Sequence, residues 1–362
     1  MRESTRVAVV GGAGYVGLAL CGELTRRRHE IVAVTRTNGR FLLDSLGVTA
    51  VTPDEVDRVG PVDAVVNLAY PNRGSIYEYP LRNRELLATI QQVSGNAARV
   101  VHVSTQAVFG FAMEYPVVVG PVRKRRDYLY IESKIQLENL LAHACGRGGL
   151  DIVRLGNVWG PASPTWTAAL ADKLLFGDPV GVAGEDGFCN ATDVANVAAY
   201  LAFLIEAPRH AGVRYHHLAE LGDTRWSWWI DRLASVLKVA PMLAKERGAY
   251  PETLTRELRG TWAAHSPTAV AREWIYGRFT GSLLRSAVRA MPRGVFAFLK
   301  RRRGRSGGGG GTSPPAVGDP VFLTIMGAER RFETCVDSAW SPPVDREGSW
   351  RAIAEWMREA GY

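Results

Sequence analysis

Short runs of apolar residues alternate along the chain with longer stretches whose apolar positions recur every three or four residues. The short runs predict strands that are buried on both faces of a sheet. They occupy residues 7–10, 30–35, 63–68, 99–104 and 151–155. The longer stretches predict helices, and they occupy residues 18–28, 79–93 and 128–143. Because strands and helices alternate, the pattern predicts an α/β fold with a parallel sheet and helices on both of its faces.

The first predicted strand runs directly into a glycine-rich turn at residues 11–17. Glycine allows positive φ in the turn, and the missing side chains let backbone N–H groups approach a pyrophosphate. The start of the following helix adds a partial positive charge at the same place. The order of strand, turn and helix predicts a dinucleotide site, and the alternative is a tight turn without a ligand. The residues predicted to bind the cofactor here are Gly11, Gly14, Tyr15, Val16 and Gly17.

The end of the second predicted strand bears on the choice of cofactor. In NAD-binding folds an Asp or Glu about 20 residues beyond the glycines binds the ribose hydroxyls. Here that place holds Thr35, and Arg36 follows. No carboxylate is present to repel a 2′-phosphate, and a guanidinium is placed to bind one. We therefore predict NADP as the cofactor, with NAD as the alternative if Arg36 only stacks on the adenine or caps the loop.

A second group of polar residues begins where the fourth predicted strand ends. That strand leads into Thr105, and the next predicted helix carries Tyr130 and Lys134. Residues four apart share a helix face, and an ammonium beside a phenol lowers the pKa of the phenol towards neutrality. Such a phenol exchanges a proton with an alcohol or a carbonyl, and a threonine hydroxyl can hold the same oxygen. The order predicts Thr105, Tyr130 and Lys134 as catalytic residues; the alternative is a Tyr–Lys pair on a solvated helix face.

With these motifs the chain resembles the extended short-chain dehydrogenase/reductase family, the group of NAD-dependent epimerases and dehydratases. Besides the glycine turn, the matching motifs are NLA at 67–69, STQAVFG at 104–110, YIESK at 130–134, RLGNVWGP at 154–161, DVA at 193–195 and SPPVDREGSW at 341–350. The resemblance implies a Rossmann-like doubly wound parallel sheet with a smaller, mostly helical C-terminal substrate domain. It also implies that Ala69, Tyr130 and Lys134 contact the cofactor and that Asn157 contacts the substrate.

The implied domain organisation divides the chain near residue 155. Residues 1–155 would form the dinucleotide-binding domain, with a return segment at about 187–220, and residues 156–362 the substrate domain. The Trp-rich stretch at 225–230 opens a predicted helix that runs to about residue 237. Its aromatic side chains favour the core of the smaller domain over stacking on a sugar. The resemblance further implies a homodimer.

The resemblance implies an NAD(P)-dependent epimerase or reductase that acts on a secondary alcohol or ketone, of a sugar or a nucleotide sugar. Gln106-Ala107 replaces the Asp-Glu pair of the family's 4,6-dehydratases, so elimination of water lacks its acid and base. The arginine that grips the diphosphate in many members is missing before the DVA motif. Its place could be taken by Arg154, Lys173, Arg214 or Arg225. Two alternatives stay open: a ketoreductase for a non-sugar or lipid-linked substrate, and a non-catalytic NADP-binding sensor.

Composition changes this picture little. The chain has 362 residues, of which 46% are hydrophobic and 22% charged, as in a soluble globular protein. No apolar run is long enough to span a bilayer, and no signal peptide precedes the first strand, so we expect a cytoplasmic protein. The four cysteines have no metal-ligand spacing, and His216 and His217 should point to opposite faces of a strand. We therefore expect no metal site.

A basic insert with a Gly-rich linker, at about 278–318, lies outside the resemblance. It holds nine cations and no acid. Because this basicity is local, we expect no binding of nucleic acid. Apolar residues alternate with the cations over 281–305, which fits an amphipathic helix packed on the substrate domain. A possible peripheral contact with anionic membrane lipid is the other interpretation.

Overall fold

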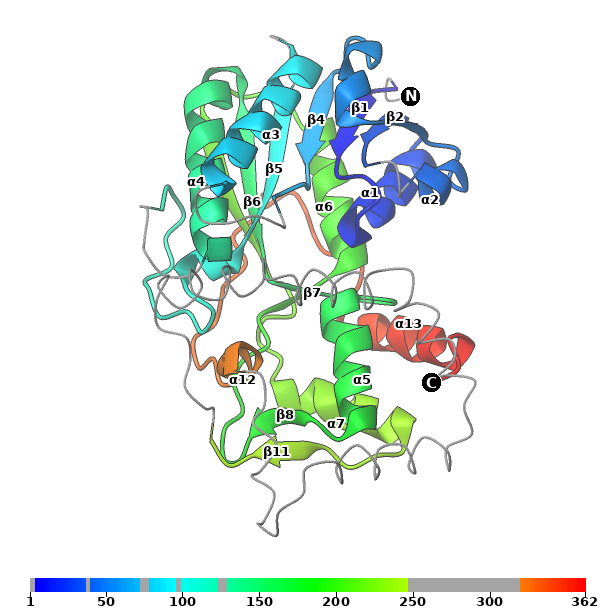
Figure 1. Cartoon of the computed structure of the whole chain (residues 1–362), viewed down its shortest axis with the longest axis vertical. Coiled ribbons are helices and arrows are strands. Elements are labelled where there is room, and N and C mark those ends of the chain that lie inside the picture. The colour runs from blue at the N-terminus through cyan, green and yellow to red at the C-terminus, as the bar shows by residue number, and fades with distance from the viewer. Residues whose placement is uncertain (1–3, 37–39, 72–77, 96–98, 123–128, 247–319) are drawn as a thin grey trace, which may run out of the picture.

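The computed structural model describes residues 4–36, 40–71, 78–95, 99–122, 129–246 and 320–362, so the basic insert lies outside the described residues. At its centre is a seven-stranded sheet with the strand order β10-β6-β5-β4-β1-β2-β3 (Figure 1). All neighbouring strands are parallel. The strands are β1 (Arg6–Val10), β2 (Glu30–Val34), β3 (Thr49–Val51), β4 (Ala64–Asn67), β5 (Arg99–Thr105), β6 (Leu150–Leu155) and β10 (Val213–Leu218).

The chain builds this sheet outwards from β1 in both directions. It runs from β1 to β2 and β3, then crosses back to β4 and continues through β5 and β6 to β10. The strand order therefore reverses between β1 and β4, and in open α/β sheets ligands bind beyond the carboxyl ends of the strands at such a point. The five predicted strands are confirmed with ends shifted by at most one residue. The strand expected around His216 and His217 is β10, whereas β3 was not predicted, because it has only three residues.

Helices cover both faces of the sheet, as predicted (Figure 1). One face packs against α1 (Tyr15–Arg26) and α6 (Val194–Glu206), through a core that includes Val7 and Val9 of β1. The other face packs against α3 (Tyr79–Ser94) and α4 (Leu129–Cys145). Successive side chains of a strand point to opposite faces, so the all-apolar strands serve both cores. This arrangement is a Rossmann-like, doubly wound fold.

The first helix begins three residues earlier than the sequence pattern predicts. It runs from Tyr15 to Arg26, so Gly17 lies inside the helix. A Cβ atom on Gly17 would stand only 2.5 Å from the carbonyl oxygens of Gly11 and Gly12. The glycine is needed there because the helix packs directly against the preceding turn, and it does not mark the helix boundary.

A second hydrophobic core lies beyond the carboxyl edge of the sheet, in the lower half of Figure 1. Trp159 and Trp229 stack there at 4.3 Å between ring centroids, and both are fully buried, so the Trp-rich stretch does form core. The main elements around this core are β7 (Asn157–Trp159), α5 (Ala169–Phe176), β8 (Pro179–Val182), β9 (Ala191–Asp193), α7 (Trp226–Leu237), β11 (Met242–Ala244), α12 (Pro320–Met326) and α13 (Arg346–Glu359). The remaining short elements are α2 (Arg40–Asp44), η2 (Pro53–Arg58), η3 (Gln106–Phe109), η4 (Gly146–Gly148) and η5 (Pro164–Ala168).

Neighbouring histidines of β10 have different surroundings. Nε2 of His216 lies 2.8 Å from a carboxylate oxygen of Asp151, while the ring of His217 packs on Phe332. The four cysteines are free thiols. Among the described residues there is no group of three or more metal-ligating side chains, and no helix combines the length and apolarity that a membrane span needs.

Candidate dinucleotide and acid–base site

The glycine turn joins the end of β1 to the start of α1 and presses against the end of β4. Gly11 has a φ of +88°, and a Cβ atom on it would lie 2.9 Å from the backbone nitrogen of Ala69. Both its conformation and this close approach require glycine. The turn therefore brings the start of α1 beside Ala69, one of the residues predicted to contact a cofactor.

The start of α1 fits an anionic group such as a pyrophosphate. The N-cap residue is Gly14, which is exposed and has no side chain that could cap the helix. The first N–H groups of a helix have no acceptor within the helix, so those of Tyr15, Val16 and Gly17 can bind an anion, aided by the helix dipole. A side chain at Gly14 or Gly11 would fill this space or force the turn apart.

The side chain of Tyr15 serves another purpose. Its hydroxyl donates to the carbonyl oxygen of Trp159 at 3.4 Å, which ties α1 to β7. Burial, together with the nearby carboxylate of Asp193, raises the pKa of this phenol above its usual range. The backbone N–H of Tyr15 can therefore bind a ligand, while its phenol stays neutral and connects α1 to β7.

The end of β2 carries an exposed arginine that can bind a phosphate. The backbone N–H of Thr35 donates to Val51 at 2.9 Å, which extends the sheet by one bond. Arg36 is exposed, and its side chain has no ion pair or hydrogen bond among the described residues. The guanidinium is thus available at the carboxyl end of β2, where the ribose of a dinucleotide binds in this type of fold.

Thr105, Tyr130 and Lys134 come together at the carboxyl end of β5. Thr105 is the last residue of that strand, and its hydroxyl forms a hydrogen bond with Tyr130 on α4. One helical turn further along α4, Lys134 is buried and its ammonium donates to the carbonyl oxygen of Val103 at 3.3 Å. The strand end and the helix that the sequence pattern singled out therefore meet in one place.

Tyr70 joins this group, although the sequence motifs did not point to it. Its ring lies 5.4 Å from the ring of Tyr130, edge to face, and 4.6 Å from the Lys134 ammonium. On the other side of Tyr130, Phe111 stacks at 6.5 Å. Tyr70 directly follows Ala69, so it links the glycine turn to the acid–base residues. The available signal was its position as an aromatic residue just after the NLA motif at the end of a strand.

Burial dominates the pKa values of the tyrosine and the lysine. It raises the pKa of Tyr130 to about 12, although the hydrogen bond from Thr105 acts in the opposite direction. It lowers the pKa of Lys134 to about 8, against the pull of the Glu138 carboxylate. The predicted shift of the Tyr130 pKa towards neutrality is therefore wrong for the protein alone, because a dry environment disfavours the charged form of both groups.

Two polar residues of the RLGNVWGP motif, which begins at the end of β6, make hydrogen bonds within the protein. The side-chain amide of Asn157 donates to the carbonyl oxygen of Cys189 at 2.7 Å. The guanidinium of Arg154 is fully buried, pairs with Glu138 at 2.7 Å and donates to two further carbonyl groups. The suggestion that Arg154 replaces the diphosphate-binding arginine is therefore wrong, because its N–H groups already donate to other residues of the protein.

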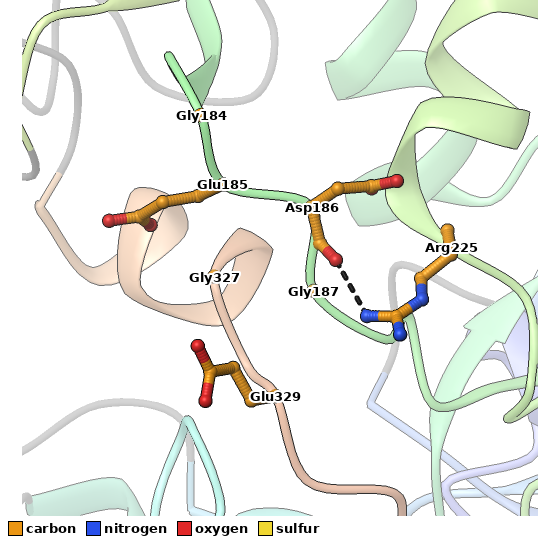
Figure 2. Close-up of a pocket in the computed structure, with 7 residues that line it drawn as sticks. All are labelled: Gly184, Glu185, Asp186, Gly187, Arg225, Gly327 and Glu329. Carbon is orange, nitrogen blue, oxygen red and sulfur yellow. Dashed lines mark hydrogen bonds between the residues drawn. The ribbon is translucent and has the colours of Figure 1, made fainter.

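The segment before the DVA motif borders a cavity of about 420 Å³ (Figure 2). Figure 2 shows the side chains of Glu185, Asp186 and Glu329 around it, with one cation, Arg225. That guanidinium donates to the backbone oxygen of Asp186 at 2.7 Å and lies 3.7 Å from the ring of Phe188. The three acids outnumber the single arginine, so the surroundings of this cavity disfavour a diphosphate.

Comparison with known proteins identifies relatives in both sequence and structure. Residues 7–213 match the model of the NAD dependent epimerase/dehydratase family. A similar protein is dTDP-6-deoxy-L-talose 4-dehydrogenase (NAD(P)(+)) of Kitasatospora kifunensis, 28% identical over 201 residues. The match covers 50% of this chain and 60% of that protein, so the chain spans less than two thirds of the relative's length.

Several solved structures share the fold. UDP-glucose 4-epimerase of Thermus thermophilus, in complex with NAD, is 21% identical with a TM-score of 0.51, over 66% of this chain and 85% of that chain. The Bordetella bronchiseptica enzyme WbmH, in complex with NAD⁺, is 19% identical with a TM-score of 0.56, over 71% and 92%. WbmG of the same organism, in complex with NAD, is 14% identical with a TM-score of 0.57, over 99% and 96%. These structural matches show a common fold, and the family match across more than half of the sequence shows that the chain belongs to the NAD-dependent epimerase/dehydratase family.

Proposed function

We propose that the protein is an NADP-dependent oxidoreductase or epimerase that acts on a secondary alcohol or ketone of a sugar or nucleotide sugar. The observation that carries this proposal is a continuous set of contacts. Gly11 abuts Ala69, and the next residue, Tyr70, touches both Tyr130 and Lys134. The acid–base residues and the proposed dinucleotide site thus lie together at the carboxyl edge of the sheet. When bound, a nicotinamide dinucleotide would supply or accept the hydride.

Each polar residue has a role that follows from its position. Tyr130 would exchange a proton with the oxygen of the substrate, and the hydroxyl of Thr105 would hold that oxygen. Lys134 would hold the nicotinamide ribose. With a pKa of about 12, Tyr130 keeps its proton at neutral pH. In this form it can donate a proton to a carbonyl oxygen, as the reduction of a ketone requires.

The proposed preference for NADP rests on the end of β2. Arg36 is exposed there, and no carboxylate follows the strand directly. The Thermus and Bordetella enzymes were solved with NAD, whereas the name of the talose dehydrogenase gives both cofactors. We expect NADPH to bind this chain more tightly than NADH, because the guanidinium can pair with the 2′-phosphate.

Two observations bear on the substrate class, and they favour different substrates. The talose dehydrogenase acts, by its name, on a dTDP-linked sugar, which supports a sugar substrate. The acids Glu185, Asp186 and Glu329 around the cavity in Figure 2 favour instead a substrate without a diphosphate, such as a ketone that is not a nucleotide sugar. Gln106 and Ala107 follow Thr105 and are buried, so a dehydratase reaction lacks an acid–base pair there.

The test combines binding with turnover. Fluorescence titration with NADPH and NADH measures affinity, and NADPH consumption with a panel of sugar, nucleotide-sugar and non-sugar ketones measures activity. Tyr130→Phe should lower turnover by about 10²- to 10⁴-fold, the usual contribution of general acid–base catalysis, while NADPH binding is kept. Undiminished turnover in that variant would contradict the proposed chemistry, and tighter binding of NADH would contradict the choice of cofactor. If no ketone is turned over while NADPH binds, the non-catalytic sensor becomes the better description.

A further inference from the structure

A buried histidine lies beside the proposed cofactor seat without a role in the chemistry above. His102 is in the middle of β5 and pairs in register with Asn67, the last residue of β4. Both side chains are completely buried, and Nδ1 of His102 lies 3.0 Å from Nδ2 of Asn67. The two side chains therefore form a buried polar contact between β4 and β5.

The other contacts of Asn67 determine which atom accepts in this pair. Its Oδ1 accepts from the backbone N–H of Ala69 at 3.1 Å, and its Nδ2 also donates to the carbonyl oxygen of Ala69 at 3.3 Å. The second hydrogen of the amide nitrogen is left for His102, which must present a lone pair at Nδ1. These contacts assign a neutral histidine with its proton on Nε2, an atom that is buried and has no hydrogen-bond partner among the described residues.

We propose that neutral His102 is a positioning residue for the dinucleotide site. It holds the amide of Asn67, the amide holds the backbone of Ala69, and Ala69 abuts the glycine turn at Gly11. This inference rests on the proposed function, since it concerns the seat of the same cofactor. The hydrogen bond of His102 goes to Asn67, and the histidine therefore acts on the glycine turn through that amide.

A proton on His102 would undo this arrangement. Nδ1 would become a donor facing the donor Nδ2 of Asn67, and the amide could restore the contact only by giving up its bond from Ala69. The charged group that faces the histidine from α4 is the Lys134 ammonium, while β6 presents the apolar Ile152 in register. Burial, with Lys134 as the second cause, keeps the pKa of His102 well below its usual value.

The experiment compares two substitutions by NADPH titration without substrate. His102→Leu removes the acceptor and should weaken binding about tenfold, the effect of one buried hydrogen bond. His102→Asn places an amide oxygen where Nδ1 lies, and binding should stay within about threefold of the unmodified protein. Val100→Ala is the control: Val100 is buried on the same face of β5, two residues away from His102. It should lower the urea midpoint without changing the affinity.

Rescue by asparagine is the readout that a purely structural role would not move. Because burial keeps the pKa of His102 well below its usual value, the histidine stays neutral between pH 7 and 5. NADPH binding to the unmodified protein and to His102→Asn should therefore depend on pH equally over this range, since the 2′-phosphate of the ligand titrates equally in both. A steeper loss of affinity in the unmodified protein would show that the histidine is charged there and would overturn the assignment of a neutral acceptor. Equal losses of affinity in His102→Leu and Val100→Ala would also overturn the proposal. So would a loss of about tenfold in His102→Asn, which decides even if His102→Leu does not fold. Absence of any dinucleotide binding by the unmodified protein would instead overturn the proposed function itself.

Discussion

The side-chain amide of Asn196 pairs with both backbone groups of Val344, a residue 148 positions further along the chain. Its Nδ2 donates to the carbonyl oxygen of Val344 at 2.7 Å, and its Oδ1 accepts from the backbone N–H at 2.9 Å. A hydrogen bond between Ser349 and Asp193 lies beside this pair. Together these contacts fasten the start of α13 to the start of α6.

Asn196→Ala should therefore lower the free energy of unfolding by roughly 2–4 kcal/mol, since two partly buried backbone groups and the carboxylate of Glu220 lose a hydrogen-bond partner. Urea denaturation followed by circular dichroism measures the loss. Asn139→Ala is a suitable control, because Asn139 is exposed and makes a single bond of 3.3 Å to Val122. A loss no larger than that of the control would show that α13 is held mainly by its apolar face.

The buried ion pair of Arg154 and Glu138 offers a second prediction. Both side chains are almost inaccessible to water, and their charged atoms lie 2.7 Å apart. Arg154→Met leaves a buried carboxylate without its partner and should cost about 3–5 kcal/mol of stability. Arg154→Met combined with Glu138→Leu should recover part of that loss, since neither charge is then left alone.

A double-mutant cycle from urea denaturation measures this coupling. Losses that simply add would show that the two side chains do not depend on each other. The titration of NADPH into Arg154→Met, which keeps Glu138, is an additional check. We expect no change in affinity, because Arg154 is engaged in the fold and not available to a ligand.

Acid should destabilise the protein partly through Asp151. Burial by itself would raise the pKa of this carboxyl, but hydrogen bonds from His216 and Arg99 and the charge of Arg99 outweigh it and lower the pKa to about 2. Because the folded-state pKa lies below the ordinary value of 3.8, the stabilisation is complete above pH 4 and disappears as the pH falls towards 2. The difference corresponds to about 2 kcal/mol.

Asp151→Asn removes this titration. Its free energy of unfolding should be lower at pH 5 but should fall less steeply than that of the unmodified protein between pH 4 and 2.5. Urea denaturation at several pH values gives both slopes. Identical slopes would mean that other carboxyl groups carry the acid sensitivity.

The pKa of Lys134 leads us to predict that NADPH affinity changes at alkaline pH. Its pKa of about 8 means that the ammonium loses its proton as the pH rises through 8. If the charged lysine holds the cofactor ribose, NADPH affinity should decrease between pH 7 and 9. Lys134→Met should bind about tenfold more weakly at pH 7, the effect of one hydrogen bond from a charged group, and show no further change up to pH 9. Parallel curves for both proteins would indicate that another group causes the alkaline loss.

The sequence by itself determined the order and type of the central elements. The strand at Val7–Val10 is a continuous apolar run, and the run at Val100–Val103 is interrupted only by His102. Such runs predict strands that are covered on both faces, and the pattern can be read from the local sequence. The glycine spacing was equally clear, because positive φ and close backbone approach exclude other residues at Gly11, and close backbone approach excludes them at Gly17. The meeting of Thr105 with Tyr130 also followed from the order of strand end and helix.

Tertiary structure alone decided the contacts between residues far apart in the chain. Nothing in the local sequence shows that Tyr70 lies against Lys134, that Asn67 faces His102, or that Arg154 turns inwards to Glu138. These contacts depend on which strands become neighbours and how closely the helices pack. The pKa of Tyr130 is the clearest case: spacing on the helix placed a lysine beside it, but burial decided the direction of the shift, and burial is a property of the whole fold.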